Sequence, residues 1–323
     1  MLPGMTMDVI DDGERVHPLR AAPENPVTVD LIAVLVAVSG DRPRTLTVQD
    51  GGALPSGPFE ADHRSLQAGL RARVERQTGH ALGYIEQLYT FADKGRAGDP
   101  ASRVISISYL GLTRERNESG PGSAWRDWYD YFPWEDHREG RPAFFEARIA
   151  RPLTAWAQGA PAGSLREERL QRVNISFGLE GLGWHEDLVL QRYELLYEAG
   201  LVPGAGATGP VQVPGKPMLA DHRRILATGI ARLRAKLKYR PVVFELLPPT
   251  FTLLQLQRCV EALSGQRVHK QNFRRLIEQQ ELVEETGALT SETIGRPAKL
   301  FRFRQAVLAE RVVAGTKIPL ARG

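Results

Sequence analysis

The sequence predicts two folded units, an α/β sandwich in the first part of the chain and a winged helix-turn-helix domain near its C-terminus. Three observations carry this prediction: a continuous apolar run at residues 27–38, a capped helix pair followed by a hairpin at residues 251–303, and a division of charge along the chain. The chain has 323 residues, which is enough for two domains with separate cores.

The first unit begins after a segment without hydrophobic periodicity. Residues 1–25 carry three prolines and scattered charges, so we expect a flexible tail there. From Pro26 onward the run VTVDLIAVLVAV is rich in β-branched and apolar residues, as in a strand that is buried on both faces. A second, shorter strand is expected at Thr45–Val48, after a turn that contains proline.

One helix and two further strands complete the expected sandwich. Leu66, Leu70 and Val74 are four residues apart, which places them on one face of a helix that ends at Gly79. The segments IEQLYTF and RVISISYLGL further along the chain predict two more strands. Strands that precede and follow a helix in the sequence, with a Gly-Pro loop leading into that helix, favour a mixed α/β sandwich. With the insertion described next, this unit is expected to span residues 26–217.

An insertion at about residues 115–217 is rich in aromatic side chains near its start. Six of them lie within ten positions: Trp125, Trp128, Tyr129, Tyr131, Phe132 and Trp134. We consider two interpretations, an aromatic shelf that stacks an adenine or nicotinamide ring, and a small satellite core or dimer contact, which we favour. A helix at residues 184–200 and a flexible connection at residues 202–216 are expected to follow.

A linker helix and the winged helix-turn-helix domain are expected over residues 218–310, with residues 311–323 as a second tail. The helix at residues 220–239 carries an apolar stripe with its basic residues mostly on the opposite side, as in core packing or a dimer seam. Thr252 and Gln255 then form the capping-box pattern of a helix start, and Gly265 ends that helix.

The rest of the domain consists of a basic helix and a hairpin. The helix buries Phe273, Leu276 and Ile277, so that its remaining faces are polar. Two short apolar segments follow, and the loop that joins them carries Gly295-Arg296-Pro297 as a stiff, basic tip. This order of elements is typical of a winged helix-turn-helix.

The candidate DNA contacts lie on these elements. Lysine and arginine suit phosphates and guanine edges, asparagine and glutamine suit adenine, and a wing arginine suits a phosphate or the minor groove. The candidate DNA-binding residues are Thr252, Lys270, Gln271, Asn272, Arg274, Arg275, Arg296 and Lys299. The alternative is that the second helix merely presents a solvated, charged face.

Charge is divided between the two parts of the chain. Residues 219–323 contain 19 lysines and arginines against 9 aspartates and glutamates, a net charge of +10, which leaves −6 for residues 1–218 within the overall +4. A basic part of this kind is the electrostatic footprint of nucleic-acid binding. An anionic membrane is the alternative, but no strongly amphipathic Trp/Lys helix lies there, so we expect no membrane partner.

Cysteine usage and hydropathy indicate the compartment. The one cysteine, Cys259, excludes an internal disulfide, and its position in the first helix of the winged domain predicts inert packing. The N-terminus lacks a signal pattern, and the longest apolar run, Leu31–Val38, is too short to span a bilayer. We therefore expect a soluble, cytoplasmic protein.

Around its first predicted helix the chain resembles the Nudix family. LPSG stands in the place of the family's Leu-Pro-Gly-Gly, and the segment QTG lines up with the end of the Nudix box. The metal-binding glutamates of that box fall on Arg73, Arg76 and Gln77. The upstream glutamate falls near His63 or Arg64. Because Mg²⁺ needs several anionic oxygens, the resemblance implies a Nudix-like fold without catalytic or metal-binding residues.

A degenerate Nudix domain followed by a winged helix is similar to the Nudix-related transcriptional regulators of NAD metabolism. The segments DHRRILATGIARLRAKLKYR, HKQNFRRLI and GRPAKLFRF carry this likeness in the C-terminal third. The resemblance implies a homodimeric repressor of NAD-biosynthesis genes that reads an inverted repeat in double-stranded DNA and responds to an NAD-related nucleotide effector. The long insertion is similar to that of the alphaproteobacterial-type subgroup.

The effector contacts are where this chain departs from the family. The family's Arg-Asp-Pro-Arg loop is GDPA here, between Arg96 and Arg103. We expect these two arginines to contact the effector together with Arg73 and Arg76 of the box helix. No histidine spacing, phosphate loop or nucleophile elbow points to a metal, a cofactor or an enzyme. The competing hypothesis is a Nudix pyrophosphatase acting on ADP-ribose-like substrates, which needs a replacement acid and metal cluster.

Overall fold

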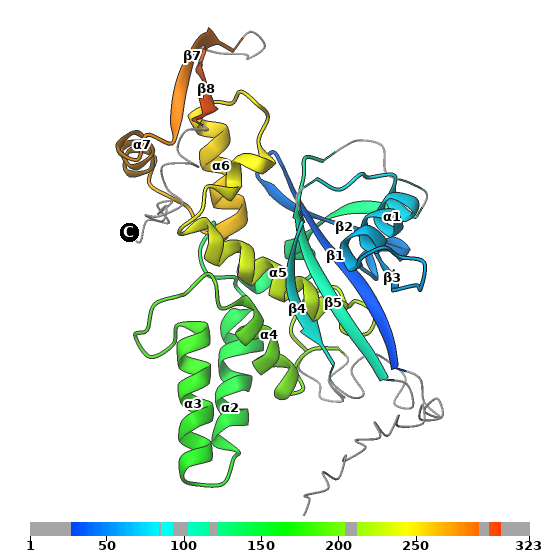
Figure 1. The fold of residues 1–323 in the computed structure, drawn as a ribbon. Coiled ribbons are helices and arrows are strands. Elements are labelled where there is room, and N and C mark those ends of the chain that lie inside the picture. Colours follow the sequence, from blue (N-terminus) through cyan, green and yellow to red (C-terminus); the bar gives the residue numbers. More distant parts are fainter. Residues whose placement is uncertain are drawn as a thin grey trace, which may run out of the picture.

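A mixed six-stranded sheet forms the centre of the first unit in this computed structural model, which describes residues 27–83, 85–92, 103–115, 120, 122–203, 212–290 and 297–304. Its strands follow the order β4-β5-β1-β2-β6, and β3 pairs with β1 (Figure 1). The strands are β1 Val27–Ser39, β2 Arg42–Val48, β3 Ser56–Pro58, β4 Ile85–Phe91, β5 Arg103–Leu112 and β6 Ser123–Asp127. All four strands that the sequence predicts in this unit are confirmed.

Helices cover the sheet on both faces, as the continuous apolar run of β1 predicts. On one face Leu31 and Leu35 pack with Leu70 and Val74 of α1 Leu66–Thr78. On the other face the alternate residues of β1 enter the larger core with α5 His222–Leu237. Gly229 of α5 comes so close to β1 that a Cβ there would lie 2.7 Å from a methyl group of Val34. The two faces of the sheet therefore pack into two different cores.

The aromatic segment of the insertion is interior. Trp128, Tyr131, Phe132 and Trp134 are each 0% exposed and belong to the same core as the linker helix and the winged domain. The rings meet edge to face, for example Phe132 and Trp134 with centroids 5.7 Å apart. These four rings are packed in the interior and form no open shelf, so the packing role that we favoured holds, but the expected satellite core is wrong. They extend the main core instead of building a satellite.

The rest of the insertion contains the predicted helix, α4, together with an edge strand and further helices that the sequence did not predict. β6 pairs antiparallel with β2, and α2 and α3 form a hairpin that projects from the body (Figure 1). The insertion contains the helices α2 Arg151–Gln158, α3 Ser164–Phe177 and α4 Val189–Glu198, and the short helices η2 Trp128–Asp130, η3 Pro133–Glu135 and η4 Glu146–Ala150. Two further short helices are η1 Gln49–Gly51 and η5 Val242–Leu246.

The helix expected at residues 184–200 begins later, as α4, for a physical reason. The carbonyl oxygen of His185 accepts a hydrogen bond from Arg192 at 2.9 Å, and that of Glu186 accepts one from Arg234 at 3.0 Å. Both arginines are 0% exposed. Because these carbonyls satisfy buried guanidinium groups, the segment before residue 189 turns toward them and does not continue the helix.

The winged domain has the predicted order of elements. It consists of α6 Leu253–Ser264, α7 Lys270–Gln279, β7 Val283–Leu289 and β8 Lys299–Phe303. The capping box at the start of α6 is confirmed, because the Gln255 amide donates to the Thr252 hydroxyl at 3.1 Å and the Thr252 amide donates to the Gln255 side chain at 2.7 Å. Cys259 is buried as expected, and burial raises the pKa of its thiol to about 12.

A buried ionic cluster joins the insertion, the linker helix and the winged domain. Both oxygens of Glu135 are bound by Arg192, at 2.6 and 2.7 Å, and one oxygen is also bound by Arg234, at 2.6 Å. Arg234 further donates from Nε to the carbonyl oxygen of Leu263, at the end of α6, at 2.8 Å. The sequence placed the basic residues of the linker helix mostly opposite its apolar stripe. For Arg234 this expectation is wrong, because its charge is held inside by Glu135.

One histidine of the linker helix is expected to make stability depend on pH. The amide of Leu54 donates to Nδ1 of His222 at 2.9 Å, and burial lowers the pKa of His222 to about 4. The unfolded chain then binds more protons than the folded one between pH 6.5 and 4, so the free energy of unfolding decreases as the pH falls through this window. This one group should contribute a loss of roughly 2 kcal/mol by about pH 4.5.

Urea unfolding of the wild type and of His222→Gln between neutral pH and about pH 4.5 measures this contribution. Glutamine can still accept the Leu54 amide but does not titrate, so the variant should show a shallower pH dependence. Identical pH dependence of the two proteins would contradict the assignment.

Within the described residues, no helix combines the length and the apolar character that crossing a bilayer requires.

Candidate nucleic-acid interface and effector site

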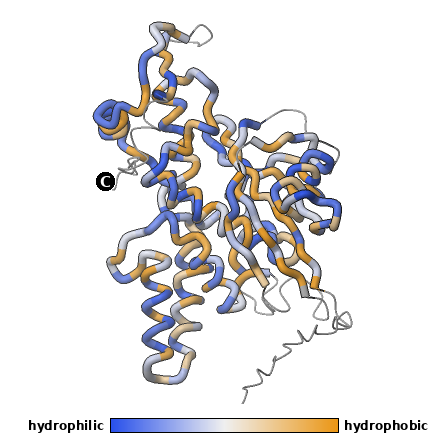
Figure 2. The backbone as a smooth tube through the Cα atoms, viewed as in Figure 1, coloured by the Kyte–Doolittle hydropathy of each residue, from blue (hydrophilic) through white to orange (hydrophobic). Residues whose placement is uncertain are grey.

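The second helix of the winged domain, α7, has one buried and one open face. Phe273 and Ile277 are each 1% exposed and enter the core. Leu276, which the sequence predicted to be buried with them, is half-buried. The exposed polar residues of α7 include Lys270, Gln271, Asn272, Arg274 and Arg275. The helix lies at the outer edge of the molecule, and Figure 2 shows its largely hydrophilic character.

The turn before α7 holds the helix in a fixed position. Gly265 ends α6 in the left-handed region with φ 72°, and a Cβ there would lie 2.2 Å from the Glu135 carbonyl oxygen, so glycine is required. The Glu261 carboxylate accepts from the Val268 amide at 3.1 Å, and the Gln257 amide group donates to the Val268 carbonyl at 3.2 Å. Side chains of α6 therefore tie down the backbone that leads into α7.

The cations of α7 have no acidic partner in the described part of the chain. Lys270, Arg274 and Arg275 form no ion pair with any described residue, whereas Lys299 and Arg302 of the wing are paired. On the wing, Lys299 contacts Glu285 at 2.9 Å and Arg302 contacts Glu284 at 2.6 Å. Three of the exposed cations without an ion pair in the described part of the winged domain thus lie on α7.

The other candidate DNA contacts have different outcomes. The Thr252 hydroxyl caps α6, so the structure gives it a structural role. Lys299 is exposed but shares its ammonium with Glu285. Arg296, at the tip of the wing, lies outside the described residues, while Pro297 beside it is exposed. The structure brings together Lys270, Gln271, Asn272, Arg274 and Arg275 but does not place Arg296 relative to them.

A groove between α6 and α7 contains residues that the sequence analysis did not single out. It encloses about 670 Å³ and places Arg258 and His269 beside Lys270 and Asn272. Arg258 is exposed, four residues after the exposed Leu254 on the same side of α6. That spacing on the face opposite the apolar stripe was the available signal.

On the other unit, two of the residues that the resemblance aligns with the Nudix glutamates, Arg73 and Gln77, contact β3. The side-chain amide of Gln77 accepts from the Ser56 amide at 3.1 Å and donates to the Ser56 carbonyl at 2.8 Å, which fastens α1 to β3. The guanidinium of Arg73 lies directly over Gly57. Burial raises the pKa of Asp30, and the positive charge of Arg73 opposes this shift. Arg73, which the resemblance aligns with a metal-binding glutamate, therefore lies against Gly57 of β3 and places a positive charge near Asp30.

The remaining effector candidates are only partly placed. Arg76 is exposed on α1. Arg103 begins β5, but its side chain lies outside the described residues, as does the whole of Arg96. The structure thus brings Arg73 and Arg76 onto one helix and leaves the other two untested.

One group of potential metal ligands gathers within the described residues, just before α1. Oxygen and nitrogen atoms of Glu60, Asp62 and His63 lie within 4.8 Å of one another. Nδ1 of His63 already accepts from the Glu60 amide at 3.0 Å, and the ring contacts that of Phe59. Both carboxylates are exposed, and carboxylates at a protein surface often gather without a metal.

The replaced box predicts that Mg²⁺ does not bind at α1. With Arg73, Arg76 and Gln77 in place of glutamates, calorimetry with millimolar Mg²⁺ should give no one-site isotherm and no thermal stabilisation. The variant Arg76→Glu/Gln77→Glu restores two carboxylates and should gain Mg²⁺ affinity. A saturable isotherm in the wild type that is lost in Asp30→Asn, a variant in which Arg73 is intact, would contradict this account.

Comparisons with known proteins agree with this architecture. Residues 243–303 match the family described as the NrtR DNA-binding winged helix domain. Over 84 residues the chain is 40% identical to the ADPR responsive transcriptional repressor NtrR of Acinetobacter baylyi, a stretch that covers 26% of this chain and 33% of that protein. The match therefore spans about a third of the length of this curated relative.

Solved structures match over most of the chain. The crystal structure of Shewanella oneidensis NrtR complexed with a 27mer DNA has a TM-score of 0.53 and 19% sequence identity, covering 90% of this chain and 99% of that chain. The crystal structure of Shewanella oneidensis NrtR has the same TM-score and identity and covers 89% of this chain and 99% of that chain. Together with the sheet and the winged helix described above, these likenesses confirm the predicted fold class, a Nudix-like α/β sandwich with a C-terminal winged helix-turn-helix.

Proposed function

We propose that this protein is a DNA-binding transcriptional repressor of NAD-biosynthesis genes, and that its Nudix-like domain senses an NAD-related nucleotide without hydrolysing it. The observation that carries the proposal is the open face of α7. It presents Lys270, Asn272, Arg274 and Arg275 from a turn that is fixed by α6. Residues of these types reach phosphates and base edges from a helix in the major groove.

The comparisons with known proteins support the same proposed function. The winged domain matches a family described as DNA-binding, and the curated relative is described as an ADPR responsive transcriptional repressor. Extending these properties to the present chain gives double-stranded DNA as one partner and ADP-ribose or a related nucleotide as the other. A single α7 reads one half-site, so we further propose a homodimer that binds an inverted repeat.

The non-catalytic role of the Nudix-like domain rests on the contacts of α1. Arg73 packs over Gly57 and Gln77 is bound to the backbone of Ser56, so neither position supplies a carboxylate for a metal. A nucleotide effector carries phosphates, and Arg73 and Arg76 are the charges on α1 that would face them. Effector binding then changes operator affinity only if the effector binds more tightly to one arrangement of the two α7 helices in the dimer than to another.

Gel-shift titration of an operator fragment tests the proposed sensing. ADP-ribose, NAD and nicotinate-type intermediates should include at least one compound that changes operator affinity at fixed salt, and the change should persist with a chelator. The variant Arg73→Ala/Arg76→Ala should bind the same operator but lose the response. If no compound changes the affinity, the link to NAD fails while the DNA-binding proposal stands.

One assay distinguishes the proposed non-catalytic sensor from the alternative, a Nudix pyrophosphatase. Mass spectrometry should detect no AMP release from ADP-ribose in the presence of Mg²⁺. Turnover that disappears in Glu60→Gln/Asp62→Asn would mean that the surface carboxylates before α1 replace those of the box, and the non-catalytic proposal would then be wrong.

A further inference from the structure

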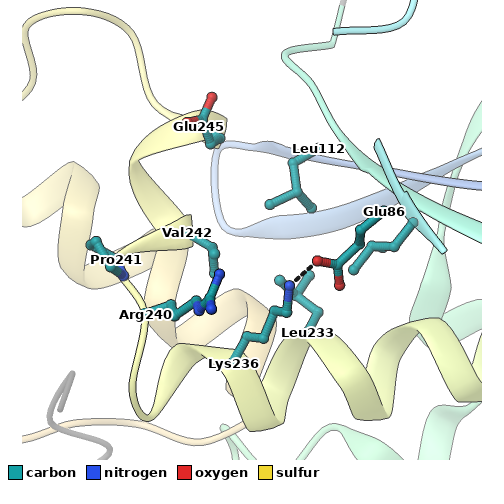
Figure 3. A pocket seen from close by; sticks show the side chains of 9 residues that line it. Glu86, Leu112, Leu233, Lys236, Arg240, Pro241, Val242 and Glu245 are labelled. Carbon is teal, nitrogen blue, oxygen red and sulfur yellow. Dashed lines mark hydrogen bonds and ion pairs between the residues drawn. The ribbon is translucent and has the colours of Figure 1, made fainter. Parts of the chain in front are cut away.

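A small pocket lies between the sheet and the segment that leads into the winged domain. It encloses about 240 Å³ and is lined from the sheet by β4 and β5 and from the opposite side by α5 and η5 (Figure 3). Its walls are apolar: Leu110 and Leu112 come from β5, Leu233 from α5 and Val242 from η5. The pocket thus touches both units of the protein.

The pocket is separate from the effector candidates on α1. Leu110 belongs to the core that contains α5, whereas its neighbour Tyr109 points to the core that contains α1. The pocket therefore lies on the face of the sheet opposite to Arg73 and Arg76. A ligand bound here does not occupy the place that corresponds to the Nudix box.

Of the four charged residues that line the pocket, two are paired with each other and two, Arg240 and Glu245, form no ion pair with the described residues. Lys236 is 9% exposed and its ammonium forms an ion pair with Glu86. Arg240 directs its guanidinium toward the same space, and the Glu245 carboxylate points away from it (Figure 3). Arg240 forms no ion pair with any residue in the described ranges. The guanidinium that faces this space, above the apolar walls, therefore has no ion-pair partner among the described residues.

We propose that this pocket is a second ligand site, and that it binds a small molecule with one flat apolar ring and one anionic group. Ligand sites for larger molecules usually enclose about 300–1,000 Å³, so the present volume suits a single ring. Leucine and valine side chains bury the ring, and the planar guanidinium of Arg240 binds the anionic group through paired N–H donors. The Lys236–Glu86 pair adds polar edge contacts without changing the net charge.

Calorimetric titration of the full-length protein tests this site. Benzoate and phenyl phosphate are the anionic probes, and benzamide is the neutral molecule of the same shape. At least one anion should bind with one-to-one stoichiometry, and Arg240→Ala should weaken that binding by about tenfold or more. Leu112→Phe, which fills the pocket, should abolish it. Arg232→Ala removes an exposed arginine of α5 that does not line the pocket and should bind like the wild type.

The outcomes separate clearly. Arg240 is exposed, so its replacement should leave the melting temperature unchanged and the test remains valid even if Leu112→Phe folds poorly. The proposal is overturned if neither anion binds, if benzamide binds as tightly as benzoate, or if Arg240→Ala and Arg232→Ala bind the anions equally well. Binding of phenyl phosphate but not benzoate would assign a phosphate as the anionic group. None of these measurements depends on DNA, so the result is independent of the proposed function.

Discussion

The variant Lys270→Ala/Arg274→Ala/Arg275→Ala is expected to lose at least about a hundredfold in operator affinity, since each base or phosphate contact contributes on the order of 1–3 kcal/mol. The three side chains are exposed on α7 and form no ion pair with the described residues, so their removal should not disturb the fold. The log–log salt dependence of binding should also become shallower, by up to about 0.9 for each phosphate contact that is lost.

A matched control removes the same charge elsewhere. Arg148→Ala/Arg151→Ala/Arg232→Ala deletes three exposed arginines on η4, α2 and α5, away from the winged domain. Fluorescence anisotropy with a labelled operator should show a much smaller loss for this control, which reports only the change in net charge. Equal losses for the two triple variants would mean that α7 is not the reader and that its polar residues form a solvated face.

The local parts of the fold could be predicted from the sequence because they depend on neighbouring residues. Thr252 and Gln255 of the capping box are three positions apart, and the unbroken apolar run of β1 indicates that this strand is buried on both faces. The open face of α7 follows from the spacing of Phe273 and Ile277. In each case the residues that determine the structure lie within one turn or one strand of each other.

The parts that were missed depend on partners distant in sequence. Glu135 is 57 residues from Arg192 and 99 residues from Arg234, and no local pattern indicates that these charges meet inside the protein. The hydrogen bonds of Arg192 and Arg234 to the His185 and Glu186 carbonyls accompany the late start of α4, and the aromatic segment expected as a satellite lies in the main core. β6 was missed because its five residues form a strand only by pairing with β2. The pocket behind the sheet likewise exists only through the placement of α5 and η5.

The buried cluster leads to the prediction with the largest expected effect on stability. Glu135→Gln keeps the shape of the side chain but removes the charge, leaving Arg192 and Arg234 without a counterion at 0% exposure. Breaking a buried ion pair from one side costs about 3–5 kcal/mol, whereas an exposed pair contributes about 0–1 kcal/mol. Burial raises the pKa of Glu135, but the two arginines lower it more, so the carboxylate is ionised at neutral pH.

Urea unfolding measures the difference, with Glu146→Gln as the control, because Glu146 and its partner Arg151 are 63% and 77% exposed. The control should unfold like the wild type. Similar midpoints for Glu135→Gln and Glu146→Gln would show that the cluster contributes no net stability.

The position of the cluster predicts where the damage appears. Arg234 binds the Leu263 carbonyl at 2.8 Å, and Tyr129, beside Arg234, donates to the Ala262 carbonyl at 2.8 Å, so the last turn of α6 is held by the insertion and the linker helix. Hydrogen exchange in Glu135→Gln should therefore accelerate in α6 and in the turn before α7, as well as in α4. Acceleration confined to α4 would mean that α7 is held in place only by contacts within the winged domain. Acceleration in both would make Glu135 the point through which the insertion fixes the orientation of the reader.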